Sequence, residues 1–263
     1  MLYCELISII VPTFQEAATL ESLLRKVHSI GLGAQKEIIV VDDGSTDGTA
    51  EIVERLAVEL HGVRLLRHAH NRGKGAAVRT GLAESRGDIV VIQDADLEYD
   101  PEDIPRLLEP LRGGVADVVY GTRLRGGQPQ RAHLFWHYVG NRFLSLLTNV
   151  LYNTTLSDME VGYKAFRGDL IRSLPLSSDR FGFEPEVTAG ILSGGDVRVY
   201  EVPIAYYGRT YSEGKKITWR DGVAAVLHLI RFRLRRWPAH ELPTARSERP
   251  TGVDDQAKAE AQP

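Results

Sequence analysis

The chain is poor in cysteine, in long apolar runs and in net charge, and each shortage excludes a class of protein. Cys4 is the only cysteine among 263 residues, which excludes an intrachain disulfide and a metal site built from several cysteines. No stretch reaches the roughly 18 to 20 consecutive apolar residues of a membrane-spanning helix. The net charge of −3 gives no general affinity for nucleic acid. We therefore expect a cytoplasmic protein that meets a membrane only from the surface.

The amino terminus also lacks the features of a targeting segment. The first residues, MLYCELISIIVPTF, contain neither a basic leader nor a cleavage site. We expect residues 7–11 to form a first strand rather than part of a signal peptide. The length suffices for one large α/β domain with a substantial core.

Short apolar runs alternate with helical patterns through the first half of the chain. This alternation predicts an α/β fold with a mostly parallel sheet and helices on both faces. The predicted strands span residues 7–11, 37–41, 63–66, 89–92 and 115–120. The predicted helices span residues 17–30, 49–60, 75–85 and 101–112. Ligands bind such sheets at the carboxyl ends of the strands, where this sequence places polar and small residues.

The second half is less regular and predicts two amphipathic helices, over residues 134–151 and 218–237. In the second helix an apolar stripe is followed by four arginines within six positions. The stripe consists of Val223, Leu227, Ile230, Leu234 and Trp237. Such a helix can lie on a membrane surface, or its stripe can pack on the sheet or on a partner subunit. Both interpretations stay open, and residues 238–263 are predicted to be a disordered tail.

Two aspartates follow the predicted strand at 89–92. Asp94 and Asp96 are two positions apart, so on an extended segment their side chains point to the same side. Hard cations such as Mg²⁺ and Mn²⁺ prefer carboxylate oxygens and share their shell with substrate phosphates. The pair therefore indicates a metal site for a diphosphate, although two acids in a turn are also commonly solvated or capping residues.

An earlier strand ends in the acidic segment DDGSTDGT at residues 42–49. Asp42 and Asp43 offer carboxylates for a base or a ribose, and the glycines let backbone approach a ligand. Ser45, Thr46 or Asp47 can instead cap the helix that begins near Thr49. Capping leaves the doubled aspartate unexplained, and both roles can hold at once.

The segment NRGKGAA at residues 71–77 opens a helix with two glycines and two cations. A helix amino terminus of this kind suits a phosphate, and Lys74 is the candidate side chain. The segment lacks the glycine and lysine spacing of a P-loop, so that motif is rejected. Lys74 can also be an ordinary surface charge.

Taken together, the motifs resemble those of the family 2 glycosyltransferases of the GT-A (nucleotide-diphospho-sugar transferase) fold. They occur in the family's order and approximate spacing and look most like the branch of dolichol-phosphate, or polyprenyl-phosphate, mannosyltransferases. The resemblance covers about residues 5 to 235 and is carried by VPTFQEAATL, EIIVVDDGSTDGT, NRGKGAAVRTGL, QDADLEYDP, GTRL, DMEVGYKAFR, FGFEPEVTA and EVPIAYYGRTYSEGKK. It implies a nucleotide-sugar donor, a Mg²⁺ or Mn²⁺ cofactor and inverting transfer of a hexose to a lipid phosphate.

The same resemblance assigns roles to individual positions. Next to the nucleotide it places Pro12, Phe14, Glu16, Val41 and Asp43. At the metal and diphosphate it places Asp94, Ala95 and Asp96, with Glu98 as a further metal-side group where the family often has glutamine. Around the donor diphosphate and the acceptor phosphate it places Arg123, Arg209 and Lys215. These assignments are expectations from the resemblance alone.

The chemistry of the acceptor separates two kinds of transferase. A phosphate monoester is already ionised near neutrality, whereas a hydroxyl has to lose a proton and usually needs a base. An anionic acceptor beside a diphosphate demands several cations, and arginine suits phosphate. The candidates are Arg123, Arg131, Lys164, Arg209, Lys215 and Lys216, each of which can also be an ordinary solvated side chain.

Three alternatives remain open. A family 2 enzyme acting on a hydroxyl would use Asp158 or a neighbour as base. Glu184 and Glu186 can face the cleft or orient cations there, and a structural role is favoured for Glu186. A nucleotidyltransferase would release pyrophosphate. A non-catalytic sensor would bind the nucleotide sugar without reaction.

The preferred hypothesis is a hexosyltransferase that uses GDP-mannose or a UDP-hexose and a polyprenyl phosphate. Its catalytic domain would span residues 1–216, followed by a membrane-surface helix at 217–237. A membrane-anchored partner protein or a homo-oligomer is compatible with it.

Overall fold

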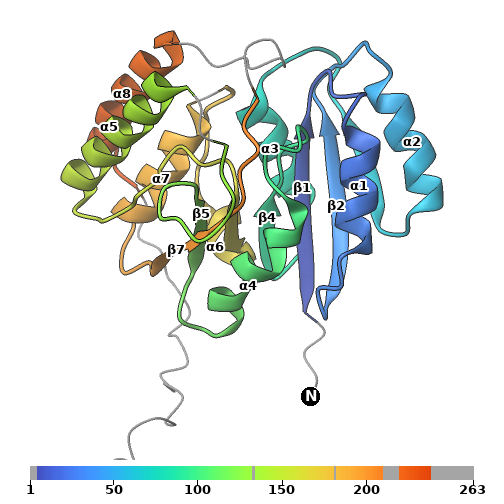
Figure 1. Ribbon diagram of the computed structural model, residues 1–263, viewed down its shortest axis with the longest axis horizontal. Helices are drawn as coiled ribbons and strands as arrows, with labels where there is room; N and C mark the ends of the chain where they lie inside the picture. The colour runs from blue at the N-terminus through green and yellow to red at the C-terminus, as the bar shows by residue number, and fades with distance from the viewer. Residues whose placement is uncertain (1–4, 132–133, 181, 210–218, 238–263) are drawn as a thin grey trace, which may run out of the picture.

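The computed structural model describes residues 5–131, 134–180, 182–209 and 219–237. These residues form a sheet flanked by helices (Figure 1). The strands are β1 (Leu6–Thr13), β2 (Gln35–Asp42), β3 (Val63–Arg67), β4 (Ile89–Ile92), β5 (Val118–Thr122), β6 (Lys164–Arg167) and β7 (Val199–Pro203). The helices are α1 (Leu20–Ser29), α2 (Thr49–Glu59), α3 (Lys74–Glu84), the short 3-10 helix η1 (Pro101–Asp103), α4 (Ile104–Arg112), α5 (Phe135–Tyr152), α6 (Gly168–Ser173), α7 (Phe183–Ser193) and α8 (Trp219–Leu234).

The seven strands have the order β3-β2-β1-β4-β6-β5-β7. All neighbouring pairs are parallel except those made by β6, which is antiparallel to both β4 and β5. Helices cover both faces of the sheet, so its central strands are rich in buried apolar residues. All four residues of β4, for example, are buried. The predicted α/β class with a mostly parallel sheet is confirmed.

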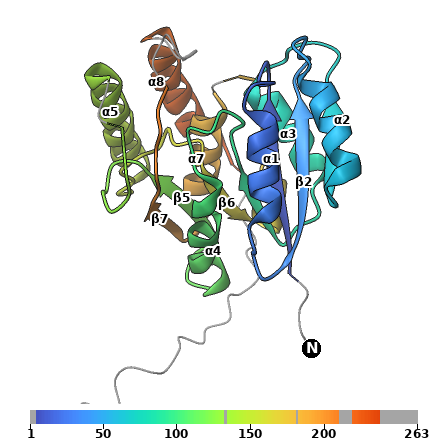
Figure 2. The same cartoon turned by 45° about the vertical axis from the view of Figure 1, so that its right-hand side comes forward.

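The helices form two layers, which the second view separates (Figure 2). The helices α1 and α2 pack on each other on one face, together with η1 and α4, while α3 and α6 pack on the opposite face. The change of face follows from the strand order, since right-handed crossovers from β1 to β2 and from β3 to β4 run in opposite directions along the sheet.

The two longest helices, α5 and α8, form a pair at one end of the molecule (Figure 1). Between α5 and α8 a small second core contains Leu144, Met159, Ala225 and Leu229. The helix α7 contacts both members of the pair. Among the described helices, none is both long and apolar enough to cross a bilayer.

Of the environments left open for the stripe on α8, the structure excludes packing on the sheet. Leu227 is 64% exposed and Leu234 is 81% exposed, so the stripe does not pack on the sheet. The buried side of the helix carries Leu229 and Phe232 instead. Trp237 leaves the stripe, because its indole nitrogen donates to the Phe232 carbonyl at 3.0 Å.

The other differences from the predicted elements are local. The strand predicted at 115–120 begins only at Val118, because the backbone N atoms of Val115 and Ala116 donate back to the Pro110 carbonyl at 3.1 and 3.0 Å. The second half also contains β6, β7, α6 and α7, which were not predicted. The predicted tail lies outside the described residues, and the domain boundaries at 216 and 237 stay predictions.

Candidate active site

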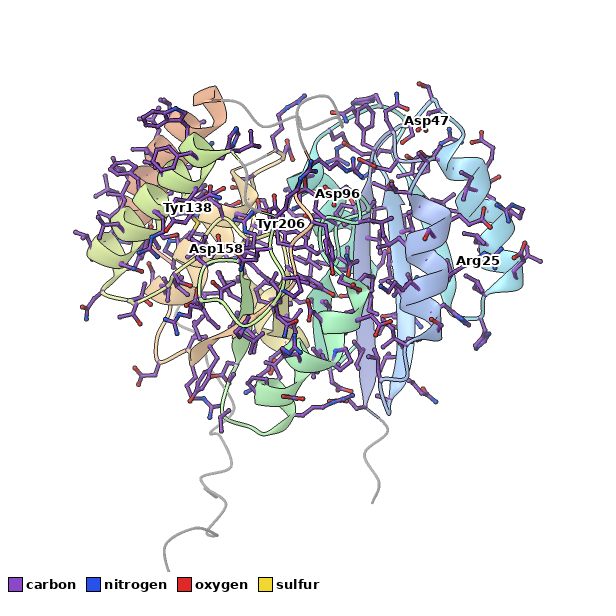
Figure 3. The ribbon with its side chains drawn as sticks, in the orientation of Figure 1. Arg25, Asp47, Asp96, Tyr138, Asp158 and Tyr206 are labelled. Carbon is purple, nitrogen blue, oxygen red and sulfur yellow. The ribbon has the colours of Figure 1, made fainter. Side chains whose placement is uncertain are left out.

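Polar side chains from several strand ends meet at one edge of the sheet. The pairing of Thr13 with Asp42 brings the ends of β1 and β2 level, and β4 runs beside β1 up to Ile92. Figure 3 shows Asp96, Tyr206 and Asp158 in the middle of the molecule, between the α5–α8 pair and the helices α1 and α2. The expected composite site is therefore assembled from segments far apart in the sequence.

The end of β2 fixes the loop that leads into α3. Asp43 is buried, and its carboxylate accepts hydrogen bonds from the backbone N of Arg72 at 2.9 Å and of Gly73 at 2.7 Å. His68 Nδ1 lies 2.7 Å from the same carboxylate. Within the described chain, these three contacts use three of the four lone-pair positions of the Asp43 carboxylate. One position on Oδ2 is left for a ligand hydroxyl. Asp43 thus shapes the 70–73 loop whether or not it also touches a nucleotide.

Asp94 is part of a chain of charges that includes Lys74. The Lys74 ammonium lies 2.8 and 3.0 Å from the two Asp94 oxygens and 3.0 Å from Glu184 Oε1. Burial disfavours the charge on Lys74, but the Asp94 and Glu184 carboxylates outweigh it and hold its pKa well above the ordinary value. Lys74 is therefore a charged member of the site rather than a solvated surface lysine.

The negative charge of Asp96 is less well compensated than that of Asp94, which pairs with Lys74. Burial, together with the nearby charges of Asp94 and Glu98, raises the pKa of Asp96 to about 7. Its Oδ1 accepts a hydrogen bond from the Glu98 backbone N at 3.1 Å. A carboxyl group in this electrostatic setting favours a cation in place of its proton.

Glu98, expected as a further metal-side group, is oriented by other partners. Its Oε1 accepts from the Arg209 backbone N at 2.6 Å, and its Oε2 accepts from the Tyr206 hydroxyl at 3.0 Å. In the described part of the chain no three His, Cys, Asp or Glu side chains are grouped to hold a metal on their own. The residues fit a cation held by the two aspartates and completed by substrate phosphate oxygens, a common arrangement for Mg²⁺.

Arg209 links this edge to β1. Its guanidinium donates to the Asp96 carbonyl through Nε at 3.1 Å and contacts Glu16 Oε2 at 3.2 Å. Glu16 also accepts a hydrogen bond from the Thr19 hydroxyl at 3.2 Å. The expected residues Glu16, Asp96 and Arg209 are thus brought together from positions up to 193 apart in sequence.

Arg123 and Asp158 form a buried ion pair. The guanidinium donates to Asp158 Oδ2 through Nε at 2.7 Å and to Oδ1 through Nη2 at 2.6 Å. The Arg123 backbone N donates to Oδ2 at 3.0 Å. Burial disfavours the charge on Arg123, but Asp158 outweighs it and holds the pKa of Arg123 well above its ordinary value. Tyr206 stacks on the guanidinium, with its ring centroid 5.1 Å from Arg123 Cζ.

Three expected residues take structural positions. Lys164 is buried beneath the site, where it donates to the Val161 carbonyl and lies 4.7 Å from the Tyr120 ring centroid. Glu186 is buried and accepts from the Ser177 and Ser178 backbone N atoms, which supports the structural alternative. Arg131 donates to the Gly208 carbonyl at 3.0 Å.

The remaining expected residues lie along the ends of β1, β2 and β4 or outside the described chain. Pro12 and Val41 are paired in register and buried, and Phe14 follows β1 as a half-buried side chain. Ala95 is buried, and its carbonyl accepts from the Thr19 hydroxyl at 2.9 Å. Lys215 and Lys216 lie outside the described residues.

Two residues of the site were not expected from the sequence. Tyr99 is buried between the rings of Tyr163 and Tyr206, and its hydroxyl accepts from the Gly162 backbone N at 3.1 Å. Glu160 has a buried Oε1 that finds no hydrogen-bond partner among the described residues, and burial raises its pKa to about 7. The only sequence signal for Glu160 was its place beside Asp158.

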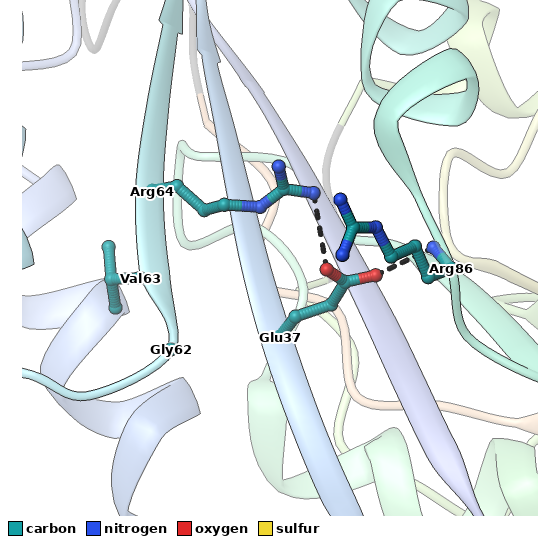
Figure 4. A pocket seen from close by; sticks show the side chains of 5 residues that line it. All are labelled: Glu37, Gly62, Val63, Arg64 and Arg86. Carbon is teal, nitrogen blue, oxygen red and sulfur yellow. Dashed lines mark hydrogen bonds and ion pairs between the residues drawn. The ribbon is translucent and has the colours of Figure 1, made fainter.

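A hollow at the opposite edge of the sheet carries little chemistry (Figure 4). It lies at the starts of β2 and β3, and its one carboxylate belongs to Glu37. That carboxylate is satisfied by the Arg64 guanidinium at 3.2 Å and the Arg86 backbone N at 2.8 Å. The edge that carries Asp94 and Asp96 is therefore the candidate active site.

Comparison with known proteins gives consistent matches. The model of the family described as Glycosyl transferase family 2 matches residues 8–174. The undecaprenyl-phosphate mannosyltransferase of Micrococcus luteus is 32% identical over 241 residues, covering 87% of this chain and 94% of its own. The undecaprenyl-phosphate 4-deoxy-4-formamido-L-arabinose transferase of Pseudomonas aeruginosa is also 32% identical, over 216 residues and 80% of this chain. The chain spans only 60% of the length of this second relative.

A solved structure shows the fold. Glucosyl-3-phosphoglycerate synthase from Mycobacterium tuberculosis, crystallised with Mn²⁺, uridine diphosphate and phosphoglyceric acid, superposes with a TM-score of 0.66 at 23% identity. The match covers 90% of this chain and 88% of that one. The predicted GT-A fold is confirmed.

Proposed function

The chain belongs to glycosyltransferase family 2, and from that premise we propose that it transfers a hexose, with inversion, to a polyprenyl phosphate. Both curated relatives described above carry undecaprenyl phosphate in their names, and one of them is a mannosyltransferase. GDP-mannose is therefore the favoured donor and mannose the favoured transferred sugar. A UDP-hexose is the alternative donor. The enzyme would work in the cytoplasm at the membrane surface.

The observation that carries the acceptor class is the buried Arg123–Asp158 pair. Asp158 occupies the position where an acceptor hydroxyl would find its base, yet its oxygens accept three N–H groups of Arg123. Both oxygens of Asp158 are therefore engaged by Arg123, and a proton from an acceptor hydroxyl would have to displace one of these hydrogen bonds. A phosphate monoester acceptor has no such requirement, since its oxygen is ionised near neutrality.

The donor diphosphate would bind at the ends of β1, β2 and β4. Asp94 and Asp96 would hold Mg²⁺ or Mn²⁺ together with the diphosphate oxygens, and the bound cation supplies Lewis-acid stabilisation of the leaving group. Arg209 would neutralise further charge from the side of β1, and Lys215 is proposed to assist from the sequence alone. The acceptor phosphate would then approach from the Arg123 side.

The nucleotide would lie along the adjoining ends of β1 and β2. Pro12 and Val41 provide an apolar floor, and Phe14 provides a half-buried ring beside it. Asp43 has one carboxylate lone-pair position left for a ribose hydroxyl. Glu16 lies next to Arg209 at the diphosphate end.

A membrane face would bring the enzyme to its lipid acceptor. Exposed apolar residues recur every three or four positions on both helices of the α5–α8 pair, which gives each helix an outward stripe. The stripes consist of Val139, Phe143, Leu146 and Val150 on α5 and of Val223, Leu227, Ile230 and Leu234 on α8. Arg231 and Arg233 are exposed beside the second stripe and suit an anionic leaflet. A membrane-anchored partner or a second copy remains compatible with the same face.

Label transfer would test the proposal directly. Purified protein is incubated with Mn²⁺ or Mg²⁺ and radiolabelled GDP- or UDP-sugars, with and without undecaprenyl or dolichyl phosphate, and the label in the organic phase is counted. Transfer that requires the lipid phosphate and releases a nucleoside diphosphate is expected. Release of pyrophosphate would indicate a nucleotidyltransferase, and tight donor binding without any product would indicate a sensor.

A hydroxyl acceptor is the second candidate, because Glu160 could serve as its base. Its unpartnered buried oxygen and a pKa near 7 suit proton abstraction. With a hydroxyl acceptor, Glu160→Gln would reduce turnover by about 100-fold or more. With a polyprenyl phosphate, the same variant would keep turnover within a few-fold of the wild type.

A further inference from the structure

Lys74 occupies both oxygens of the carboxylate that the proposed function assigns to the metal. Its ammonium lies 2.8 Å from Asp94 Oδ1 and 3.0 Å from Oδ2. A divalent ion approaching Asp94 must therefore displace a positive charge that is already bound there. The same ammonium lies 3.0 Å from Glu184, so a second counter-ion is within reach when it moves.

The fold holds Lys74 in this position from both sides. Asp43 binds the backbone N of Arg72 and Gly73, immediately before Lys74. The Ala76 backbone N donates to the Asp179 carbonyl at 3.0 Å, which fixes the first turn of α3. The lysine stem therefore starts from an anchored backbone, and its ammonium is directed to Asp94.

Gly162 makes the close approach possible. A Cβ at this position would lie 2.3 Å from Asp94 Oδ2 and 3.0 Å from the Lys74 ammonium. Any larger residue would have to push the pair apart, because such distances are shorter than real carbon contacts. The backbone of Gly162 is in turn held by the Tyr99 hydroxyl at 3.1 Å. The backbone at Gly162 thus lies directly against the Asp94–Lys74 pair.

We propose that Lys74 is a built-in counter-ion that keeps Asp94 closed to divalent cations until the donor diphosphate arrives. The diphosphate offers Lys74 new anionic partners, while Glu184 retains part of the contact. Asp94 is then released to share the cation with the phosphate oxygens. The inference rests on the proposed function for the identity of the ligands, and it predicts that cation and nucleotide bind with strong mutual dependence.

The test measures Mn²⁺ binding to the purified chain without sugar or acceptor, by titration calorimetry or by the spin-resonance signal of free Mn²⁺. The key variant is the double substitution Lys74→Met with Glu184→Gln, which removes one charge of each sign and leaves the net charge of the site unchanged. We expect it to bind Mn²⁺ alone about tenfold more tightly than the wild type, within the usual range for coupled sites. We also expect the gain in Mn²⁺ affinity caused by GDP or UDP to shrink by a similar factor.

Two further variants keep the test specific and independent of folding. Lys74→Met alone should also bind Mn²⁺ more tightly, and both variants are checked by circular dichroism and thermal unfolding. Arg67→Met is the matched control, because Arg67 pairs with Asp42 at the same sheet edge and does not contact Asp94 in the structure. It should leave Mn²⁺ affinity within about twofold of the wild type. Unchanged affinity in both Lys74 variants, or an equal gain in Arg67→Met, would overturn the proposal.

The outcome is separable from the fate of the proposed function. Tighter Mn²⁺ binding by the Lys74 variants without any sugar transfer by the wild type would support the counter-ion and reject the transferase reaction. Normal metal-dependent transfer with unchanged Mn²⁺ affinity in the variants would support the transferase reaction and reject the counter-ion. Failure of Mn²⁺ to bind any variant, with or without nucleotide, would overturn both.

Discussion

On one side of the site, the ends of β1, β2 and β4 are held in place by hydrogen bonds and ion pairs, whereas on the other side α5 and α8 turn apolar side chains outward. We name these the donor side and the acceptor side, and we include in the acceptor side the Arg123–Asp158 pair and Glu160, which follow β5 and α5 in the chain. Asp43, Lys74 and Asp94 on the donor side are fixed by partners that the chain itself supplies. The stripes on α5 and α8 have no such cover within the described chain. A small ionic donor requires preorganised charges, and a lipid acceptor requires an apolar surface to dock on.

The largest expected effect on turnover comes from the donor side. Asp96→Ala should reduce turnover at least about 100-fold, which corresponds to roughly 2.7 kcal/mol of transition-state stabilisation. The reason is the loss of one of two carboxylates proposed to hold the cation at the diphosphate. Initial rates of label transfer at saturating Mn²⁺ would measure it.

Glu98→Gln is the matched control for that substitution. The side chain can still accept from the Arg209 backbone N and bind the Tyr206 hydroxyl, as the carboxylate does. Turnover within about tenfold of the wild type is expected, because an oriented partner is retained. Near-normal turnover by Asp96→Ala, with and without chelator, would contradict the assignment of a metal to the donor side.

On the acceptor side, the buried Arg123–Asp158 pair should dominate stability. Asp158→Asn leaves a buried guanidinium beside a neutral group, and breaking a buried pair typically costs about 3 to 5 kcal/mol of unfolding free energy. Urea unfolding of the purified variant would measure the change. Glu21→Gln, which weakens an exposed pair with Arg55, should leave the free energy of unfolding nearly unchanged. Equal urea midpoints of unfolding for the two variants would show that the buried pair stabilises the fold no more than the exposed pair does.

The sequence predicts the donor side better than the acceptor side, for a physical reason. The strands β1 to β4 are apolar runs separated by helices, so local periodicity and strand ends suffice to place Asp43 and Asp94. The strand β6 is only four residues long and enters antiparallel between β4 and β5. Its register depends on strands distant in sequence, and no local pattern contains that information.

The pairings of charged residues could not be predicted either. The partners Arg123 and Asp158 are 35 positions apart, and Lys74 and Asp94 are 20 apart. Both pairs depend on how loops fold over the sheet edge, and the second also requires a glycine at 162. For α8, the stripe was visible in the sequence, but whether it faced the sheet or the exterior was decided by the contacts of Ala225 and Leu229 with α5.

A smaller effect is expected at the apolar stripes. Burying a leucine contributes about 1.5 to 3 kcal/mol, so Leu227→Asp should weaken binding to anionic vesicles by about tenfold or more. Flotation with vesicles containing phosphatidylglycerol would measure it. Val58→Asp is the control, since Val58 is 90% exposed on α2, at the other end of the molecule (Figure 1). Equal losses from the two variants would reject the stripes as the docking surface.

The smallest expected effect concerns the pH dependence of stability on the acceptor side. Burial raises the pKa of Glu160 from 4.5 to about 7 in the folded chain. Between those values the folded state binds more protons than the unfolded state, so this carboxyl makes the protein less stable as pH rises from about 4.5 to about 7. Burial lowers the pKa of the neighbouring Lys164 to about 8, which gives the opposite slope above pH 8.

Glu160→Gln removes the first of these slopes and leaves the second. The unfolding free energy of the variant minus that of the wild type should therefore grow from about pH 4.5 to 7 and then level off. Urea unfolding at half-unit pH intervals would measure the difference. Parallel profiles would mean that Glu160 is solvated or paired in solution. Glu160 would then be no more an uncompensated carboxyl than Asp43 on the donor side. The hydroxyl-acceptor alternative would lose its base.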